Sequence, residues 1–139
     1  MKIINETLNL STKGDGDLIN ITGQLEAMMN PSKIKNGIMT VFVIGSTAAI
    51  TTFEYEGGLI ADIREFCEKI LPKTKHYHHD DTWGDANGFS HMRATLFGPS
   101  LVIPFENGKL CLGTWQQVVL AEFDNRGRQR TVVVQMMGE

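Results

Sequence analysis

Leu101–Met137 reads L-V-I-P-F-E-N-G-K-L-C-L-G-T-W-Q-Q-V-V-L-A-E-F-D-N-R-G-R-Q-R-T-V-V-V-Q-M-M, and it indicates the fold class more clearly than the rest of the chain. Its apolar residues alternate with polar ones or form short blocks rich in β-branched residues, which is typical of strands. Asn107-Gly108 is a strong hairpin signal, and Asp124–Arg128 has the composition of a turn. We therefore expect sequential antiparallel strands at Leu101–Phe105, Lys109–Leu112, Thr114–Phe123 and Gln129–Met137.

The first half of the chain carries further strand patterns. Lys2–Leu10 alternates between apolar and polar residues, which predicts a half-buried strand. Gly37–Ile44 is almost entirely apolar, which predicts a central strand covered on both faces. Ile50–Tyr55 indicates another strand, and Asp17–Ile21 either extends a strand or enters a helix.

Three segments favour helices. Thr22 is placed to cap a short helix at Gly23–Met29, which Asn30-Pro31 should end because the residue before proline avoids the helical region. Glu56–Leu71 carries an apolar stripe at helical spacing and stops before Pro72, and His91–Phe97 suits a short helix ending at Gly98. Strands with two or three helices give an α+β fold.

Composition limits the classes of function. A chain of 139 residues fits one domain, residues 1–139, and a net charge of −3 gives no reason to expect nucleic acid or a membrane as partner. No apolar run reaches the roughly 20 residues of a membrane span. Cys67 and Cys111 lie far apart within apolar patterns, so buried free thiols and a cytoplasmic location are expected.

The segment His76–Gly98 is the most promising place for chemistry. It holds all four histidines, His76, His78, His79 and His91, together with the carboxylates of Asp80, Asp81 and Asp85. Neutral imidazole binds zinc-class metals, and a loop between His79 and His91 could bring the two rings together. The competing interpretation is a polar, solvent-facing loop, and both stay open at this stage.

Several other residues allow two interpretations each. Asn87 is either a left-handed turn residue or a site amide, and Trp83 is either a loop anchor in the core or a contact across an interface or ligand. Ser46 and Thr47 follow Gly45 at a strand end, where backbone N–H groups can hold an anion, although a plain turn explains them equally.

The same ambiguity holds for polar residues near the C-terminus. Thr114 and Gln116 share one face of their predicted strand, where they either line a pocket or face water. Arg126, Arg128 and Arg130 cluster at a turn and either bind phosphate or form an exposed basic turn.

These motifs resemble those of a known family. A-N-G-F-S-H-M-R-A-T-L-F-G-P-S, followed by V-I-P-F-E-N-G-K-L-C-L-G-T-W-Q-Q-V-V-L-A-E-F-D-N-R, closely resembles the YjbQ family, and the likeness runs from about Lys2 to Gly138. The resemblance implies an α+β sandwich of mostly antiparallel strands, homotrimers with pockets near subunit contacts, and a weak, secondary thiamine-phosphate synthase activity.

The resemblance also implies a set of site residues. The family's motif positions fall on His79, Asn87 and His91 as catalytic residues. The family's threonine and glutamine fall on Thr114 and Gln116. With Ser46 and Thr47 from the strand end and Arg128 from the turn, these are the predicted substrate-binding residues. The histidine-rich segment supplies the predicted metal ligands His78, His79, His91 and Asp85. Many members carry a histidine where this chain has Gly45, and His78 is the residue available to substitute for it.

The implied reaction joins a pyrimidine diphosphate to a thiazole phosphate and releases pyrophosphate. It makes the protein a transferase that binds a small phosphorylated ligand, and the departing charge calls for basic groups or a divalent metal, zinc or magnesium. The alternative is a non-catalytic homotrimer that binds a small anionic or thiamine-like ligand.

Overall fold

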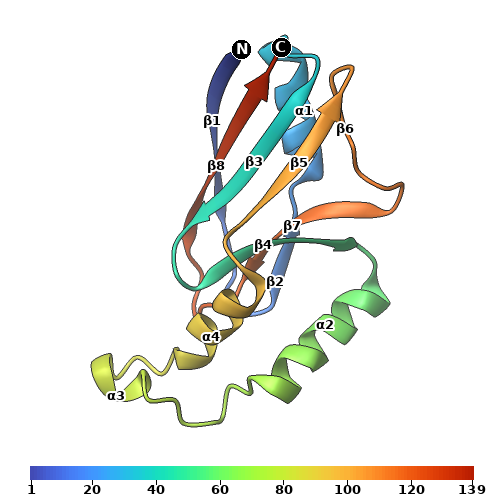
Figure 1. Ribbon diagram of the computed structural model, residues 1–139. Coiled ribbons are helices and arrows are strands. Elements are labelled where there is room, and N and C mark those ends of the chain that lie inside the picture. The colour runs from blue at the N-terminus through green and yellow to red at the C-terminus, as the bar shows by residue number, and fades with distance from the viewer.

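The computed structural model describes residues 1–139 as two β-sheets with four helices (Figure 1). The strands are β1 (Lys2–Ser11), β2 (Asp17–Asn20), β3 (Gly37–Ile44), β4 (Ala48–Glu54), β5 (Ser100–Glu106), β6 (Lys109–Leu110), β7 (Gln116–Glu122) and β8 (Gln129–Gly138). The helices are α1 (Thr22–Ser32), α2 (Gly57–Ile70), α3 (Asp80–Trp83) and α4 (Gly88–Phe97). The expected α+β class is confirmed.

All strand pairs are antiparallel, but neighbours in sequence are mostly not neighbours in space. The larger sheet has the order β1-β8-β3-β5-β6 and the smaller one the order β2-β7-β4. The expectation of sequential pairing through the last strands is therefore wrong, because only β5 and β6 form such a hairpin. β7 leaves for the smaller sheet, and β8 returns to lie between β1 and β3.

β7 is the strand that is covered on both faces. Its residues Val118 and Leu120 point into a core shared with the larger sheet and α1, to which α1 contributes Leu25. Val119 and Ala121 point the other way, into a second core under α2 and α4. This alternation explains why β7 runs through four consecutive apolar residues that are all buried.

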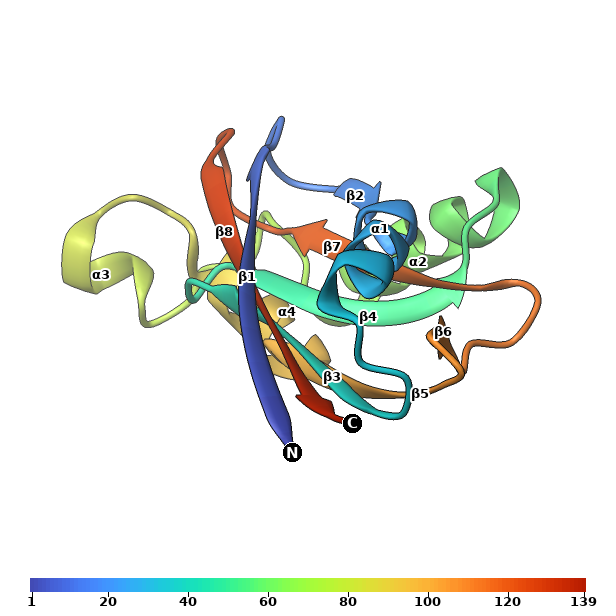
Figure 2. The same ribbon diagram turned by 90° about the horizontal axis from the view of Figure 1, so that it is seen from above.

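β3 does not have the two covered faces that its sequence suggests. Met39, Val41 and Val43 are buried, whereas the residues between them point outward, and Phe42 and Ile44 remain 42% and 54% exposed. The alternation follows from the pleat, which sends successive side chains to opposite faces. Nothing within one chain lies over the outer face of this sheet, as the view from above shows (Figure 2).

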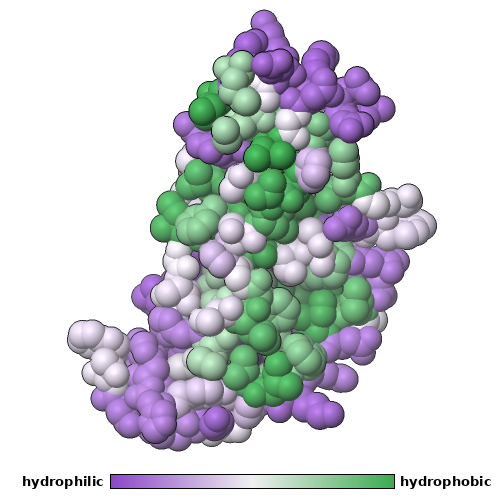
Figure 3. Space-filling view, viewed as in Figure 1, coloured by the Kyte–Doolittle hydropathy of each residue, from purple (hydrophilic) through white to green (hydrophobic).

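That outer face carries no charge along its paired rows, and its one outward charged residue on β5 is Glu106 at the end of the strand. In the registered rows of β1, β8, β3 and β5, no outward position from Ile3 to Pro104 is Lys, Arg, Asp or Glu. Apolar and polar uncharged side chains alternate there, and hydrophobic surface gathers down the middle of this side of the molecule (Figure 3). We call this surface the neutral sheet face; its apolar members are Ile3, Ile38, Phe42, Ile44, Val102, Pro104, Val133 and Met137.

α1 differs from the expectation at both ends. Its N-cap is Ile21, and the Thr22 hydroxyl accepts a hydrogen bond from the Val118 N–H at 2.8 Å, so Thr22 joins the helix to β7 instead of capping it. Pro31 lies inside the last turn, and the helix continues to Ser32. Pro31 has no backbone N–H to donate within this turn. The Ser32 hydroxyl adds a hydrogen bond there by donating to the Met29 carbonyl at 2.6 Å.

Other boundaries shift by a few residues. β7 begins at Gln116, so Thr114 precedes the strand and the predicted shared face of Thr114 and Gln116 is wrong. α4 begins at Gly88, three residues before its predicted start, and the short α3 was not expected. Trp83 is 78% exposed and thus no core anchor, and Cys111 is exposed although Cys67 is buried.

The two ends of the chain meet. β1 and β8 pair along their whole length, from Lys2 opposite Gly138 to Ser11 opposite Gln129. The amino group of Met1 lies 3.2 Å from the Glu139 carboxylate, and both ends appear at the same edge of the molecule (Figure 1). No helix has the length and apolar character that crossing a membrane requires.

Candidate functional site

The histidine-rich segment forms an arm that projects from the body of the protein. α3 stands at its tip, well away from both sheets in two perpendicular views (Figures 1 and 2). The Asp80 carboxylate closes the base of the arm, because it accepts the Tyr77 N–H at 3.0 Å and the Gly88 N–H at 2.9 Å. These two hydrogen bonds lower the pKa of Asp80 below its ordinary value.

Gly88 is required for this closure. A Cβ atom at this position would lie 2.4 Å from the Tyr77 Cβ and 2.8 Å from the Asp80 Oδ1. Real Cβ atoms do not approach other atoms so closely. The absence of a side chain therefore lets the start of α4 touch the segment that leads into the arm.

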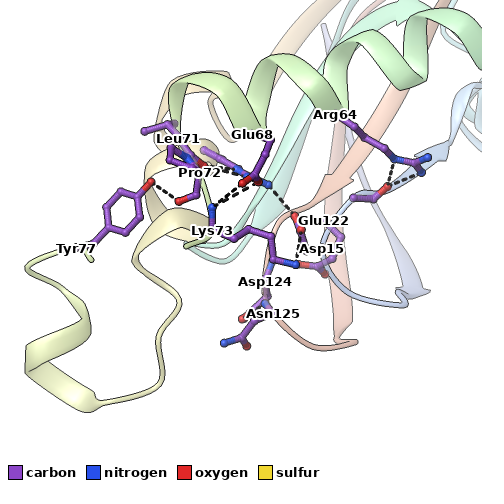
Figure 4. A network of polar contacts seen from close by, with 12 residues as sticks. Asp15, Arg64, Glu68, Leu71, Pro72, Lys73, Tyr77, Glu122, Asp124 and Asn125 are labelled. Atoms are coloured by element: carbon purple, nitrogen blue, oxygen red, sulfur yellow. Dashed lines mark hydrogen bonds and ion pairs between the residues drawn. The ribbon is translucent and has the colours of Figure 1, made fainter. Parts of the chain in front are cut away.

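The chain between α2 and the arm is tied to the body through buried Arg93. Its guanidinium donates to the Leu71 carbonyl at 2.9 and 3.0 Å and forms ion pairs with Asp15 and Glu68, each at 3.0 Å. The Tyr77 hydroxyl donates to the Pro72 carbonyl at 2.9 Å, and Figure 4 shows this bond beside the Glu68 and Asp15 contacts. These contacts fix where the arm leaves the protein.

His79 and His91 meet as the sequence predicts. Their ring centroids are 4.2 Å apart and the planes are tilted by 52°. The rings share a cavity of about 490 Å³ with the other two histidines and Lys75, and we call it the histidine pocket. The residues that line it are Leu71, Lys75, His76, Tyr77, His78, His79, Gly88, His91 and Met92.

His91 is held in its neutral form more readily than an ordinary histidine. Burial lowers its pKa, and the neighbouring His79 lowers it further, while the carboxylates of Asp124 and Asp85 act in the opposite direction. A neutral imidazole has a free lone pair that can accept a proton or bind a cation. The pair therefore offers an acid–base group at neutral pH.

Two polar atoms beside this pair lack a partner. The Asn87 side chain is 4% exposed, and its Oδ1 accepts no hydrogen bond; the Ser90 hydroxyl is fully buried and also makes none. Asn87 is the N-cap of α4, with φ −111°, but its side chain does not cap the helix, and the left-handed residue is Ala86, with φ +54°. Buried polar groups without partners are rare in folded proteins, so these atoms mark a place for a water or ligand.

A buried ionic cluster forms the wall behind His91. Arg130 donates to both oxygens of Glu122, at 2.5 and 2.8 Å, and to the Thr47 hydroxyl at 2.7 Å. The Thr47 hydroxyl in turn donates to Asp124 at 3.0 Å. Burial raises the pKa of Asp124, but hydrogen bonds from Asn125, Thr47 and Arg128 outweigh it and lower that pKa. Asp124 is therefore a fixed negative charge near His91.

This cluster changes the interpretation of two predicted residues. Thr47 is buried, and its hydroxyl donates to Asp124 and accepts from Arg130. Its hydrogen bonds are therefore satisfied within the ionic cluster, without a ligand. Arg128 donates to Asp124 at 2.8 Å through Nε and lies 2.7 Å from it through Nη2. Asp124 and Ser90 are absent from the predicted site residues. A charged residue, Glu122, at the end of an apolar strand is the sequence feature that could have indicated the buried ionic cluster.

A smaller cavity of about 220 Å³ lies on the other side of His91. Gly45 and Ser46 line it together with His91 and Thr95. Gly45 has φ +140°, and a Cβ there would lie 2.7 Å from the Arg130 Nη1. Gly45, the position where many relatives are expected to carry histidine, thus lines a cavity together with His91. His78 lines the histidine pocket instead of this smaller cavity, so it does not occupy the place of that histidine.

Thr114 and Gln116 are not brought to the histidines within one chain. Gln116 pairs with Glu54 at one end of β4, whereas Ala48, at the other end, adjoins His91. Seven residues of strand separate the two ends by about 20 Å at roughly 3.3 Å per residue. The Gln116 side chain accepts from the Gly113 N–H and donates to the Thr52 hydroxyl, at 3.0 and 3.2 Å.

The fit to a metal is incomplete. No three or more His, Cys, Asp or Glu side chains are grouped so that they could hold a metal ion. His79 and His91 supply two imidazoles, while the backbone carbonyl of Asp85 accepts from the Asn125 side chain at 2.7 Å and its carboxylate reaches His91 only electrostatically. A zinc site needs three or four protein ligands, and one chain does not supply them.

The fold and the paired histidines define a small α+β protein with a histidine-lined pocket at the root of an arm, and known proteins share the fold. The family model described as UPF0047 protein YjbQ-like matches residues 6–139, and the chain belongs to this family. A UPF0047 protein of Archaeoglobus fulgidus is 40% identical over 126 residues, which cover 91% of this chain and 96% of the relative.

Two further comparisons agree. A UPF0047 protein of Methanothermobacter thermautotrophicus is 37% identical over 139 residues, covering 100% of this chain and 95% of that protein. The crystal structure of a YbjQ-like protein of unknown function from Sulfolobus solfataricus P2 superimposes with a TM-score of 0.91 at 35% identity, over 99% of both chains. The resemblance seen in the sequence motifs is confirmed.

Proposed function

We propose that the histidine pocket binds a small phosphorylated molecule and that His79 and His91 act on it as acid–base groups. The observation that carries this proposal is the contact between the two rings, 4.2 Å apart, in a cavity of about 490 Å³ lined by all four histidines. Lys75, His76 and His78 line the same cavity and offer N–H donors to phosphate oxygens. Two of the protein's other features support a ligand here.

The first feature is the pair of buried atoms without a partner, Asn87 Oδ1 and Ser90 Oγ, in the first turn of the helix that carries His91, although neither residue lines the histidine pocket itself. The second is the lowered pKa of His91, which keeps a proton acceptor available at neutral pH. His79 and His91 are proposed to share one proton between their rings and to donate it to the phosphate oxygen of the leaving group.

The reaction proposed for this site is a weak thiamine-phosphate synthase reaction. A pyrimidine diphosphate would lose pyrophosphate while its carbon forms a bond with the ring nitrogen of a thiazole phosphate. The leaving diphosphate carries most of the charge, and Lys75 with the outer histidines would stabilise it. A divalent metal, zinc or magnesium, stays a prediction, and no step of this proposal passes through it. Two free thiols fit a reducing compartment such as the cytoplasm.

The second candidate is ligand binding without turnover. It is favoured by the positions of the predicted substrate-binding residues: Thr47 and Arg128 bind Asp124, and Thr114 and Gln116 lie at the far end of the smaller sheet. Under this alternative the pocket holds a small anionic or thiamine-like molecule, and the protein is a homotrimer.

The homotrimer itself is proposed through the neutral sheet face. The paired outward rows of its four long strands carry no charge, and an exposed sheet surface with several apolar side chains together marks an interaction site. Phe42, Ile44 and Val102 are 42%, 54% and 56% exposed in one chain, and a second copy would cover them. Interfaces between subunits are depleted of charge in their centre, as this face is.

Turnover and binding can be separated in one experiment. Untagged protein is mixed with a pyrimidine diphosphate and a thiazole phosphate, and pyrophosphate release is followed. We expect turnover in the parent, a loss of about 10²-fold or more in His91→Gln, and near-parent rates in Glu26→Gln, an exposed position on α1 that does not line the pocket. Undiminished turnover in His91→Gln would remove the catalytic assignment.

The binding alternative gives a different result in the same samples. Pyrophosphate would raise the melting temperature of the parent by mass action while no product forms. The increase should disappear in the double variant His79→Gln/His91→Gln. Absence of both turnover and a melting shift, in the parent, would contradict the proposed phosphorylated ligand altogether.

A further inference from the structure

A second cavity lies at the opposite end of the smaller sheet from the histidine pocket. It has a volume of about 240 Å³ and opens where β4 ends and β7 begins. Its lining residues are Asn20, Glu54, Tyr55, Glu56, Trp115 and Gln117. About 20 Å of strand separates it from His91, so it does not belong to the proposed acid–base site.

The floor and one wall of this cavity are fixed by hydrogen bonds. The Asn20 amide donates to the Gln117 side chain at 3.2 Å, which joins β2 to β7 under the cavity. The Tyr55 hydroxyl donates to the Leu18 carbonyl at 2.5 Å, so its ring cannot turn away freely. Gln116 holds the loop before β7 through Gly113, and this loop carries Trp115. The aromatic groups therefore stand on an ordered base.

The charge of the lining is entirely negative. Glu54 and Glu56 contribute two carboxylates, and no lysine or arginine lines the cavity. Glu56 accepts the Gly58 and Leu59 N–H groups at the start of α2. Glu54 forms no ion pair with any basic residue of the chain, so its charge is left for a partner outside the protein.

The aromatic residues point to the kind of partner. Trp115 is 71% exposed at the mouth of the cavity, and Tyr55 is 39% exposed beside it. The face of an indole or phenol ring attracts a cation, and aromatic rings combined with carboxylates are the usual way to hold a quaternary ammonium group. A volume of about 240 Å³ falls below the roughly 300 Å³ at which drug-sized sites begin.

We infer that this cavity, which we call the aromatic–acidic pocket, binds a small organic cation with an ammonium group. Trp115 and Tyr55 supply the ring faces, and Glu54 supplies the opposing charge. The ligand is a free small molecule, because the cavity is too small for a larger one.

Choline tests this inference, with 3,3-dimethylbutan-1-ol as an uncharged molecule of nearly the same shape. The chain has two tryptophans, so a Trp83→Phe variant leaves Trp115 as the only indole reporter. Titration with choline at constant ionic strength should change the Trp115 fluorescence with saturation. The neutral alcohol should bind at least threefold more weakly, since an exposed cation–π contact changes affinity about two- to fivefold.

Two variants complete the test, read by NMR line broadening of the choline methyl groups. We expect Glu54→Gln and Trp115→Leu each to weaken choline binding at least threefold, while Glu26→Gln, an exposed position on α1 outside the cavity lining, leaves it unchanged. Equal binding of choline and the neutral alcohol, a fluorescence change without saturation, or unaltered affinity in both variants would overturn the inference. Circular dichroism of each variant checks that the fold is kept.

Discussion

His91 links the geometry of the site to a measurable pH dependence. Its pKa is lowered from the ordinary 6.5, first by burial and then by His79. The folded protein therefore binds this proton less readily than the unfolded chain, so the free energy of unfolding should rise with pH up to about 6.5 and fall as pH drops below it. Urea unfolding between pH 5 and 7.5 measures the slope, which should shrink in His91→Gln.

His79 provides the matched test of the same prediction. Replacing it by glutamine removes one of the two influences that lower the pKa of His91, so that pKa should move upward. Proton NMR of the imidazole signals follows the change. A pKa of His91 that is the same in parent and His79→Gln would show that the two rings do not interact in solution.

Gly88 allows a prediction about packing. In Gly88→Ala the new methyl group meets the Tyr77 Cβ at 2.4 Å, so the arm or α4 must shift. Overpacking of this kind costs about 1–3 kcal/mol of stability. Gly23→Ala, where a Cβ meets nothing within 4 Å, is the control and should be neutral or stabilising. Chemical unfolding compares the two, and equal stability would contradict the close contact.

Residue types in the histidine segment suggested that His79 and His91 could converge, but they left a solvent-facing loop equally open, and only the structure decides between the two interpretations. The spatial separation of Thr114 and Gln116 from these histidines could not be predicted. It depends on β7 joining the smaller sheet, and a local pattern contains no information about which strands pair. The orphaned Ser90 and the buried Asp124 depend on tertiary packing in the same way.

The arm is the element whose stability depends most on one side chain. Asp80 holds both ends of it through the Tyr77 and Gly88 N–H groups. In Asp80→Ala these amides lose their acceptor, so their hydrogen exchange should accelerate by more than tenfold, while the melting temperature changes little. NMR-detected exchange measures it. Asp81→Ala, at an exposed position on the same arm, is the control.

The pH dependence of the arm follows from the same contact. Hydrogen bonding lowers the pKa of Asp80 below its ordinary 3.8, so the closure is complete above that pH and is lost as the pH falls through the lowered pKa. Slow exchange at Tyr77 and Gly88 in the Asp80→Ala variant would show that another group closes the arm.

Among the elements, α2 and β3 were predicted almost residue by residue, since a helical stripe ending at proline and a β-branched run are strong local signals. α1 was predicted too short. Pro31 was expected to end it, but a proline in the last turn removes only one backbone hydrogen bond, and the Ser32 hydroxyl adds another by donating to the Met29 carbonyl. α3 is too short to have a periodic pattern.

The neutral sheet face makes a prediction for the whole molecule. A charge placed at its centre, in Phe42→Glu, would be buried without a partner between two copies, which costs several kcal/mol. We expect the parent to elute as a trimer and Phe42→Glu as a monomer in size-exclusion chromatography with light scattering. The control is Glu26→Lys on α1, which packs against the other side of this sheet.

The outcome also decides what covers this face. A parent protein that is monomeric at micromolar concentration would contradict the homotrimer, and the exposed apolar side chains would then need another occupant. The sequence suggested that β3 is covered on both faces. One chain covers only one of them, and a partner copy would supply the second cover.

The pairing of β1 with β8 has a practical consequence. Because Met1 and Glu139 lie within ion-pair distance, a short linker could join the native ends into a continuous chain. New ends could then be opened at the Asn107-Gly108 turn between β5 and β6, at the loss of the two hydrogen bonds that join this turn to Lys35 and Asn36. In such a circular permutant both sheets would be preserved. The new chain break would lie outside the segments that form the histidine arm and the aromatic–acidic pocket, so both would stay intact.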